Sequence, residues 1–332
     1  MENKLNIQQN TKIFVSCPAN VATGGPELLH QLVHELNKLN FNAFMFYHDM
    51  DNTNPIHKEY IKYDNPYVDK IEDDKNNILI VPEMNTGMIY NYTNIQKVIW
   101  WLSVDNYYKI FQSNIIWKSF IKKILYKLGY FKVYRFQKDI KLLHFVQSEY
   151  AKQHLLNKGI TNISFLGDYL NELFIKKQID NFNNQKEDII IYNPKKGIEF
   201  TKKIINNSKN IKFVPIENMT REEVATLLSR AKVYIDFGNH PGKDRIPREA
   251  AISGCCIITN KQGSAKYYED VMINDRFKFD DIDNNIPNII KKIQDCINNY
   301  NDNISKFDKY RKKIKQEQSY FISDIKKIFL VE

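Results

Sequence analysis

Residues 236–256 constrain the fold of this chain more than any other stretch, because they join a strand end, a charged loop and a helix start. The apolar run 233–235 just before them is short enough to form a buried strand. Pro247 suits the first turn of a helix, where its missing N–H would be unpaired anyway. Gly254 then ends this helix, and a second apolar run covers residues 255–259. Strand, helix and strand in this order are typical of a parallel α/β sheet.

The loop between the first strand and this helix is crowded with ionisable side chains. Gly238 and Gly242 allow the backbone to turn and to approach a ligand closely. Free N–H groups and the helix dipole both favour an anion at a helix start, so the loop predicts an anion-binding site. The alternative is a buried strand, loop and helix whose charges are simply solvated. The ionisable residues are His240, Lys243, Asp244, Arg245, Arg248 and Glu249.

This stretch resembles the donor-binding signature of GT-B glycosyltransferases, in which seven residues separate two glutamates. In that signature alanine follows the second glutamate, and a glycine and an apolar strand come later. Residues 249–258 match the second half. The first half differs, since Pro241 stands where the first glutamate belongs and Asp244 is the nearest acid. The resemblance implies that Glu249 binds the ribose hydroxyls of a sugar nucleotide. It makes His240 and Asp244 candidates for contacts with the sugar or the acceptor.

Residues 193–197, Asn-Pro-Lys-Lys-Gly, resemble the segment in which GT-B enzymes place a Lys-Gly pair on the donor diphosphate. The arginine usually found a few residues earlier is absent, so Lys195, Lys243 or Arg245 is expected to supply the second cation. Cations are needed because the leaving diphosphate gains negative charge as the glycosidic bond breaks. A turn that binds no ligand is the alternative. The expected donor-binding residues are Asn193, Lys195, Lys196, Lys243, Arg245, Arg248, Gly263 and Ser264.

Two glycines also follow the first strand expected in the chain, at residues 12–17. Gly24 and Gly25 precede a helix that starts at Pro26, and they lie in the first strand-to-helix turn of a Rossmann-like domain. The full dinucleotide fingerprint is absent, so the pair alone is weak evidence for phosphate binding. The pair does resemble the Gly-Gly loop that lines the inter-domain cleft of GT-B enzymes. A plain turn is the other interpretation.

The length of 332 residues suggests two domains of ordinary size. The predicted fold is α/β of the GT-B type, with two Rossmann-like doubly wound domains facing an inter-domain cleft. Thr220, followed three residues later by Glu223, predicts a capping box at a helix start in the second domain. Expected strands cover residues 12–17, 41–47, 77–82, 97–102, 142–146, 163–166, 188–192, 211–215, 233–235 and 255–259. Expected domains are an acceptor domain at 1–175, a sugar-nucleotide donor domain at 188–315, and a C-terminal helix at 316–332 that packs back on the first domain.

The formal net charge of +9 has a local origin, because residues 106–138 hold eight cations and no acid. Within them, residues 116–128 place apolar side chains on one half of a helix and lysines on the other. Such a helix suits the interface of an anionic membrane, while a core helix with a solvated lysine face is the alternative. Nucleic acid is not expected as a partner, since the rest of the chain is near neutral. The expected membrane patch is Trp117, Lys118, Lys122, Lys123 and Lys127.

Other patterns narrow the setting and the chemistry. No stretch approaches the ~18 apolar residues of a membrane span, and the polar start of the chain lacks a signal peptide's apolar region. The four cysteines lack metal-ligand spacing, so we expect a cytoplasmic protein, with peripheral association with the inner face of the membrane left open. Asp49 and Asp51 follow a strand as in GT-A enzymes that bind a divalent cation, but that interpretation leaves the Glu249 motif unexplained. We therefore expect neither metal nor cofactor.

Together these features predict a glycosyltransferase that moves a sugar from a nucleoside-diphosphate sugar to a glycan or lipid-linked acceptor. The expected setting is bacterial capsule or lipopolysaccharide-type synthesis, and the Glu249 resemblance implies retention of anomeric configuration. Two alternatives stay open. A sugar-nucleotide epimerase on the same fold would need the donor site but no acceptor, and a non-catalytic binding protein would keep only the fold.

Overall fold

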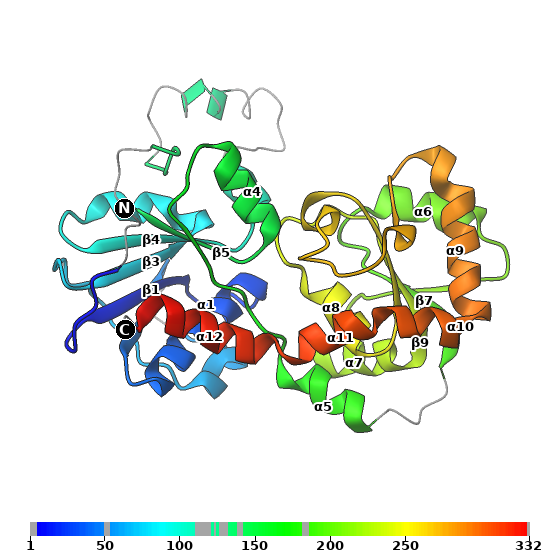
Figure 1. The fold of residues 1–332 in the computed structure, drawn as a ribbon, viewed down its shortest axis with the longest axis horizontal. Helices are drawn as coiled ribbons and strands as arrows, with labels where there is room; N and C mark the ends of the chain where they lie inside the picture. The colour runs from blue at the N-terminus through cyan, green and yellow to red at the C-terminus, as the bar shows by residue number, and fades with distance from the viewer. Residues whose placement is uncertain are drawn as a thin grey trace. The chain divides into compact units, whose positions relative to one another are not determined.

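The computed structural model describes residues 5–49, 54–109, 121–122, 124–125, 132–137, 142–180 and 186–330, with no side chains for 177–180. The chain divides into two compact units. The first comprises Met1–Asp168 with Ser319–Glu332, and the second comprises Tyr169–Gln318. Each unit is built around one parallel sheet with helices packed against it (Figure 1).

The first unit contains a six-stranded sheet in the order β2-β1-β3-β4-β5-β6. Every neighbouring pair is parallel. The strands read as near-continuous apolar runs because helices and loops cover both faces of a parallel sheet; all five residues of the central strand β3 are buried. The strands are β1 Lys12–Pro18, β2 Asn42–His48, β3 Ile78–Pro82, β4 Gln96–Trp101, β5 Leu143–Val146 and β6 Ile163–Phe165.

The helices of the first unit bury their apolar faces against this sheet. In α1 (Gly24–Lys38), the predicted core positions Leu28, Leu32, Val33 and Leu36 are all buried, which confirms the sequence-based helix. In the C-terminal helix α12 (Glu317–Phe329), the Phe321 ring lies 6.5 Å from the Trp100 ring. The remaining helices are η1 Lys58–Tyr63, η2 Glu83–Asn91, α2 Val104–Lys109 and α4 Glu149–Asn157.

The second unit contains a five-stranded parallel sheet in the order β11-β10-β9-β7-β8. Its strands are β7 Glu187–Tyr192, β8 Lys212–Pro215, β9 Ala231–Asp236, β10 Cys256–Asn260 and β11 Lys278–Phe279. Its α-helices are α5 Glu172–Asp180, α6 Ile198–Asn207, α7 Arg221–Arg230, α8 Arg245–Ile252, α9 Ile286–Asn298, α10 Tyr300–Ile304 and α11 Asp308–Lys315. Short 3-10 turns are η3 Gly263–Lys266, η4 Asp275–Phe277, η5 Asp283–Asn285 and η6 Ser305–Phe307.

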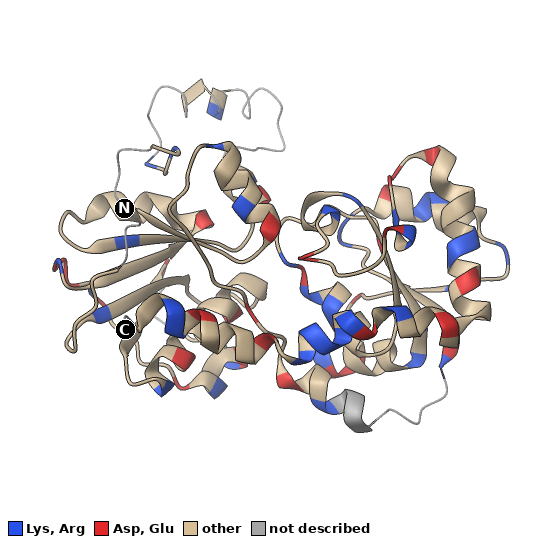
Figure 2. Ribbon diagram, viewed as in Figure 1, with Lys and Arg blue, Asp and Glu red and all other residues tan. Residues whose placement is uncertain are grey.

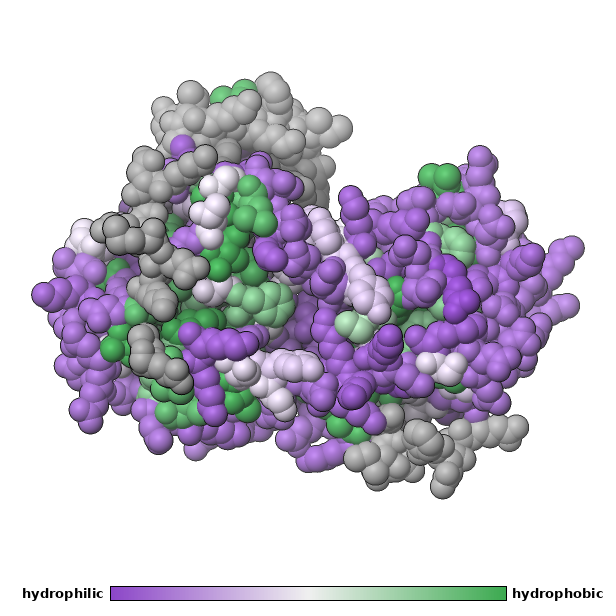
Figure 3. Space-filling view, viewed as in Figure 1, coloured by the Kyte–Doolittle hydropathy of each residue, from purple (hydrophilic) through white to green (hydrophobic). Residues whose placement is uncertain are grey.

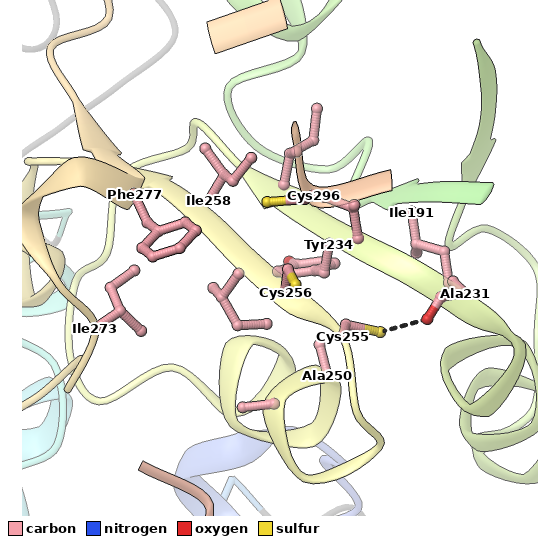
Figure 4. Packing of buried hydrophobic residues seen from close by; sticks show 14 of the residues in the cluster. Ile191, Ala231, Tyr234, Ala250, Cys255, Cys256, Ile258, Ile273, Phe277 and Cys296 are labelled. Carbon is pink, nitrogen blue, oxygen red and sulfur yellow. Dashed lines mark hydrogen bonds between the residues drawn. The ribbon is translucent and has the colours of Figure 1, made fainter. Parts of the chain in front are cut away.

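The core of the second unit lies between the strands and the helices on their faces. Figure 4 shows side chains from β9, β10 and α8 meeting there, with Phe277 and Ile273 beside Ile258. All four cysteines of the chain are buried and free. By contrast, the face of this unit seen in Figure 3 is mostly hydrophilic, and α11 carries several basic residues (Figure 2). The sheet is therefore enclosed by amphipathic helices, as the sequence pattern of the second half requires.

The first unit ends earlier than the sequence analysis placed it. Leu170 and Phe174 are buried in the hydrophobic core of the second unit, so residues 169–175 belong to the second unit rather than to the first. The polar composition that marks a linker begins only after these side chains. The boundary drawn from composition was therefore wrong by a few residues, because α5 turns its apolar face to the second core.

Most of the basic segment 106–138 lies outside the described residues, including Trp117, Lys118, Lys123 and Lys127 of the expected membrane patch. Lys122 is described and half-buried, and Ile121 and Ile124 are exposed. Membrane binding by this segment stays a prediction. Within the part of the chain that the structure describes, no helix has the length and hydropathy needed to cross a bilayer.

Candidate active site

Three loops meet at the carboxyl ends of β7, β9 and β10, which are neighbours in the second sheet. Ligands of open α/β sheets bind at this edge. The loops touch through their backbones at glycines. A Cβ on Gly197 would lie 2.2 Å from the carbonyl oxygen of Phe237, and a Cβ on Gly263 would lie 2.0 Å from that of His240. Both glycines have a positive φ, of 62° and 52°, so any other residue would be strained there as well as too large.

The ammonium of Lys196 lies at the centre of this edge. Its Nζ is 3.3 Å from Asp236 Oδ2 and also forms an ion pair with Asp244. It donates a hydrogen bond of 3.3 Å to the carbonyl oxygen of Asn239. Burial alone would lower the pKa of the Lys196 ammonium, but the carboxylates of Asp236 and Asp244 outweigh burial and raise that pKa. Lys196 is therefore held as a cation by groups of the protein itself.

His240 and Asp244, the candidates for contacts with the sugar or the acceptor, lie in the same network. His240 is fully buried, and its Nδ1 is 2.8 Å from Asp244 Oδ2. Burial raises the pKa of the Asp244 carboxyl, but the hydrogen bond from His240 and the charge of Lys196 prevail, so the pKa is lowered. Asp244 is thus an ionised carboxylate that accepts hydrogen bonds from both His240 and Lys196.

Asp236 is the member of this network that sequence reasoning missed as a site residue. Its side chain is 1% exposed and receives a hydrogen bond of 2.8 Å from the Tyr234 hydroxyl and one of 3.1 Å from the backbone N–H of Gly238. Burial, followed by the charge of Asp236, raises the pKa of Tyr234. The residue is visible in the sequence only as the last position of an apolar strand, so no local signal distinguishes it.

The loop after β9 is fixed by further hydrogen bonds from β10 and the turn that follows it. The side-chain amide of Asn260 donates to the carbonyl of Gly238 at 2.8 Å. Ser264 donates its backbone N–H to the carbonyl of His240 at 2.8 Å and its hydroxyl to the carbonyl of Gly242 at 2.6 Å. Ser264, an expected donor-binding residue, is fully buried. The structure gives its hydroxyl a role in holding the loop.

Lys243 and Arg248, also expected on the donor, both contact Glu317. Arg248 is fully buried and donates from Nη1 to Glu317 Oε2 at 2.8 Å. It also donates to the backbone carbonyls of Asp244 at 3.2 Å and of Lys243 at 3.2 Å. The Lys243 Nζ lies 2.9 Å from Glu317 Oε1. These three side chains form an ionic clamp that holds the loop to the first residue of α12, and sequence reasoning missed Glu317.

The other expected donor residues are more open. Lys195 is exposed, and its backbone N–H donates to Asn193 Oδ1 at 3.0 Å, which forms a tight polar turn. Arg245 and Glu249 are half-buried in α8. Pro247 lies in the first turn of this helix and Gly254 follows its end with φ of 85°, so the predicted helix start and stop are confirmed.

In the first unit, the expected cleft glycines begin α1. A Cβ on Gly25 would lie 3.6 Å from Leu102 Cδ1, which is an ordinary van der Waals distance, so packing does not require glycine at this position. A buried acid that sequence reasoning missed lies at the carboxyl edge of the same sheet. Glu83 is 2% exposed and accepts from the backbone N–H of Leu102 at 3.0 Å, and its burial raises the pKa to about 7. It follows β3 directly, where a polar residue after an apolar run is the only sequence signal.

Comparison with known proteins agrees with this architecture. No family model matches the chain. An alpha-1,6-glucosyltransferase of Actinobacillus pleuropneumoniae serotype 7 is 26% identical over 150 residues, which are 40% of this chain and 45% of that protein. The match thus spans less than half the length of the curated relative.

Solved structures resemble the whole chain. Sucrose-phosphate synthase from Thermosynechococcus elongatus has a TM-score of 0.67 at 13% identity, over 97% of this chain and 98% of that one. A protein from Anabaena in complex with UDP and glucose has a TM-score of 0.60 at 10% identity, over 96% of this chain and 99% of that one. UDP-GlcNAc 2-epimerase from Neisseria meningitidis has a TM-score of 0.54 at 11% identity, over 96% of this chain and 100% of that one. The predicted fold is confirmed: this chain has the GT-B architecture of two parallel-sheet α/β units.

Proposed function

We propose that this protein is a glycosyltransferase that moves a sugar from a nucleoside-diphosphate sugar to a glycan or lipid-linked acceptor. The observation that carries the proposal is the carboxyl edge of β7, β9 and β10. There, glycine-packed loops, several cations and the Glu249 helix meet in a chain with the GT-B fold. The match to an alpha-1,6-glucosyltransferase supports the same activity.

In this proposal the donor nucleotide lies on the second unit. Glu249, half-buried in α8, binds the ribose hydroxyls. Lys195, which is exposed, and Arg245, the first residue of α8, bind the diphosphate as it gains negative charge. The N-caps Gly197 and Asp244 give α6 and α8 no side-chain hydrogen bond. The N–H groups of both first turns are thus suited to an anion.

The finer points of the proposal concern the acceptor and the outcome of the reaction. Gly24 and Gly25 at the start of α1 are candidates for contacts with the acceptor. The basic segment 106–138 suits a peripheral protein that reaches a lipid-linked acceptor in capsule or lipopolysaccharide-type synthesis. Retention of anomeric configuration rests on the resemblance of the Glu249 motif. The proposal assigns no metal or cofactor to the transfer step.

The alternative function is a sugar-nucleotide epimerase, since epimerases share the fold over nearly the whole chain. An epimerase changes the nucleotide sugar itself and needs no acceptor. Product analysis after incubation with a nucleotide sugar separates the two. An epimeric nucleotide sugar favours the alternative, whereas release of the nucleoside diphosphate, increased by a glycan acceptor, favours transfer.

A thermal-shift screen tests the donor site first. UDP, GDP, dTDP, CMP and NAD are added to the wild type, to Glu249→Ala and to Glu222→Ala, which changes an exposed glutamate of α7. A ligand that binds only the folded state stabilises it by about 2.7 kcal/mol at 100 times its Kd. We expect one nucleoside diphosphate to raise the Tm of the wild type and the control but not of Glu249→Ala. No shift with any nucleoside diphosphate would remove the main support for the proposal.

A further inference from the structure

The surroundings of the Lys196 ammonium are those of a cation site. Three oxygens lie around Nζ: Asp236 Oδ2, Asp244 Oδ2 and the carbonyl oxygen of Asn239. The His240 ring stands next to the same carboxylates, with Nδ1 at 2.8 Å from Asp244 and Nε2 at 3.8 Å from Asp236. Carboxylate oxygens, a carbonyl oxygen and an imidazole nitrogen are the groups with which proteins bind divalent cations.

Asp236, His240 and Asp244 are also arranged as a ligand set. They offer one ligand atom each, and these atoms all lie within 4.8 Å of one another. A second observation concerns the imidazole of His240. The Nε2 of His240 is buried and has no hydrogen-bond partner among the residues that the structure describes. Buried polar atoms are rarely left in that state, and a metal ion is a common partner for a neutral imidazole.

The loops are built to bring the lysine to this place. A Cβ on Gly238 would lie 2.5 Å from Lys196 Cγ and 2.7 Å from its Cδ, so the lysine stem crosses the loop where only glycine leaves room. Gly197, the next residue in the chain, fits against Phe237 for the same reason. Two glycines on two loops thus determine the path of one side chain.

We propose that the ammonium of Lys196 is an internal cation that takes the place of a divalent metal ion among Asp236, His240 and Asp244. The two carboxylates lie close together, and the ammonium supplies a positive charge that contacts both. While the lysine is present, the ligand set is closed to metal. Removal of the ammonium opens a site for a first-row divalent cation. This inference does not depend on the transferase activity.

Cobalt binding to variants tests the inference, because Co²⁺ bound by imidazole and carboxylates absorbs visible light. Wild type, Lys196→Ala, and Lys196→Ala combined with His240→Gln are titrated with Co²⁺, and Tm is measured with and without Zn²⁺. We expect Lys196→Ala to have a lower Tm than the wild type, to bind one equivalent of Co²⁺, and to regain Tm with Zn²⁺. The double variant and the wild type should gain neither absorbance nor Tm.

Two results would overturn the inference. One is a folded Lys196→Ala that binds no Co²⁺ above the double variant. The other is a wild type that binds one equivalent of Co²⁺ in a manner abolished by His240→Gln alone, which would mean that metal displaces the lysine. Should Lys196→Ala fail to fold, Lys196→Gln keeps a hydrogen-bond donor beside the carboxylates without the charge. The same titration then applies, with Lys196→Gln combined with His240→Gln as its control.

Discussion

Two half-buried lysines lie at opposite ends of β7, and they differ in what surrounds them. Lys186, just before the strand, donates to three neutral carbonyls: those of Leu228 at 3.2 Å, Ala231 at 3.0 Å and Ser253 at 2.6 Å. Lys196, just after the strand, lies between carboxylates. Burial lowers the pKa of Lys186, whereas the carboxylates raise that of Lys196.

The difference indicates that Lys186 stabilises the fold, whereas Lys196 lies in the candidate site. Leu228 lies in the last turns of α7, and Ser253 caps the end of α8. Lys186 therefore satisfies carbonyls at helix ends, where the dipole favours a cation. Its partners bring no opposite charge. At the other end of the strand, formal charges, glycine turns and a lysine side chain that is one-fifth exposed lie together, which is the composition expected of a binding site.

The largest expected effect is that of Lys196→Ala on stability. The change leaves Asp236 and Asp244 facing each other without their cation. Breaking such a buried pair typically costs about 3–5 kcal/mol. Urea unfolding at pH 7, without added metal, should show a loss of this order in the free energy of unfolding. A loss below about 1 kcal/mol would mean that the network is solvated rather than held by the lysine.

Lys186→Met should cost less. It keeps most of the stem but leaves three carbonyls without their donor, and a hydrogen bond to a charged group is worth about 1.5–3 kcal/mol. We expect a loss of about 2–3 kcal/mol in urea unfolding, on the scale of one such bond, because the removal of a buried ammonium offsets part of the cost. The Tm rise with the preferred nucleotide should be unchanged. If that rise disappears, the two ends of the strand are not functionally distinct.

The pH dependence of these two variants should have opposite signs. The raised pKa of Lys196 means that its contribution is present below the unfolded value near 10.5 and is lost as pH rises through the higher folded pKa. The stability gap between wild type and Lys196→Ala should therefore narrow above about pH 10.5.

For Lys186, whose folded pKa is lowered, the unfolded state binds the proton more tightly. The gap between wild type and Lys186→Met should widen as pH rises toward about 10.5. Urea unfolding at a series of pH values from about 8 to about 11 measures both stability differences. If the two differences change with pH in the same direction, the opposite pKa shifts given to Lys196 and Lys186 are wrong.

The smallest effect on stability is expected for Lys195→Ala. The side chain is exposed, and surface substitutions usually change stability by within about 0.5 kcal/mol. Nucleoside-diphosphate binding should nevertheless weaken about tenfold, since a charge-assisted hydrogen bond is worth about 1.5 kcal/mol. Exposed Lys202→Ala on α6 serves as the matched control. Equal affinities of the two variants would exclude Lys195 from the diphosphate site.

Local sequence patterns were sufficient for the elements and for the ends of helices. Apolar runs located ten of the eleven described strands to within a residue or two, and Pro247 and Gly254 delimited α8. The two-residue strand β11 was missed, because so short a segment shows no apolar run. The capping box of Thr220 and Glu223 is present as predicted, with hydrogen bonds of 2.7 Å and 3.2 Å. These features depend on residues a few positions apart, so a single sequence contains the information.

The interactions that define the site were not predictable in this way. Arg248 and Glu317 are 69 positions apart in the chain, and Lys196 and Asp244 are 48 apart. Only the packing of strands β7, β9 and β10 brings the second pair together. Sequence reasoning singled out the loops after β7, β9 and β10, but it could not tell that Lys196 faces carboxylates of the protein. It also had no signal for Glu317, the acid that forms the ion pair with Arg248.

Calorimetric titration of the nucleoside diphosphate selected by the thermal screen tests the central claim most directly. It compares the wild type with Glu249→Ala at the carboxyl edge and Lys186→Met at the amino edge of the second sheet. We predict one binding site per chain, abolished by Glu249→Ala and retained with unchanged affinity by Lys186→Met. Unchanged affinity in Glu249→Ala, or equal loss in both variants, would contradict a donor site at the carboxyl edge.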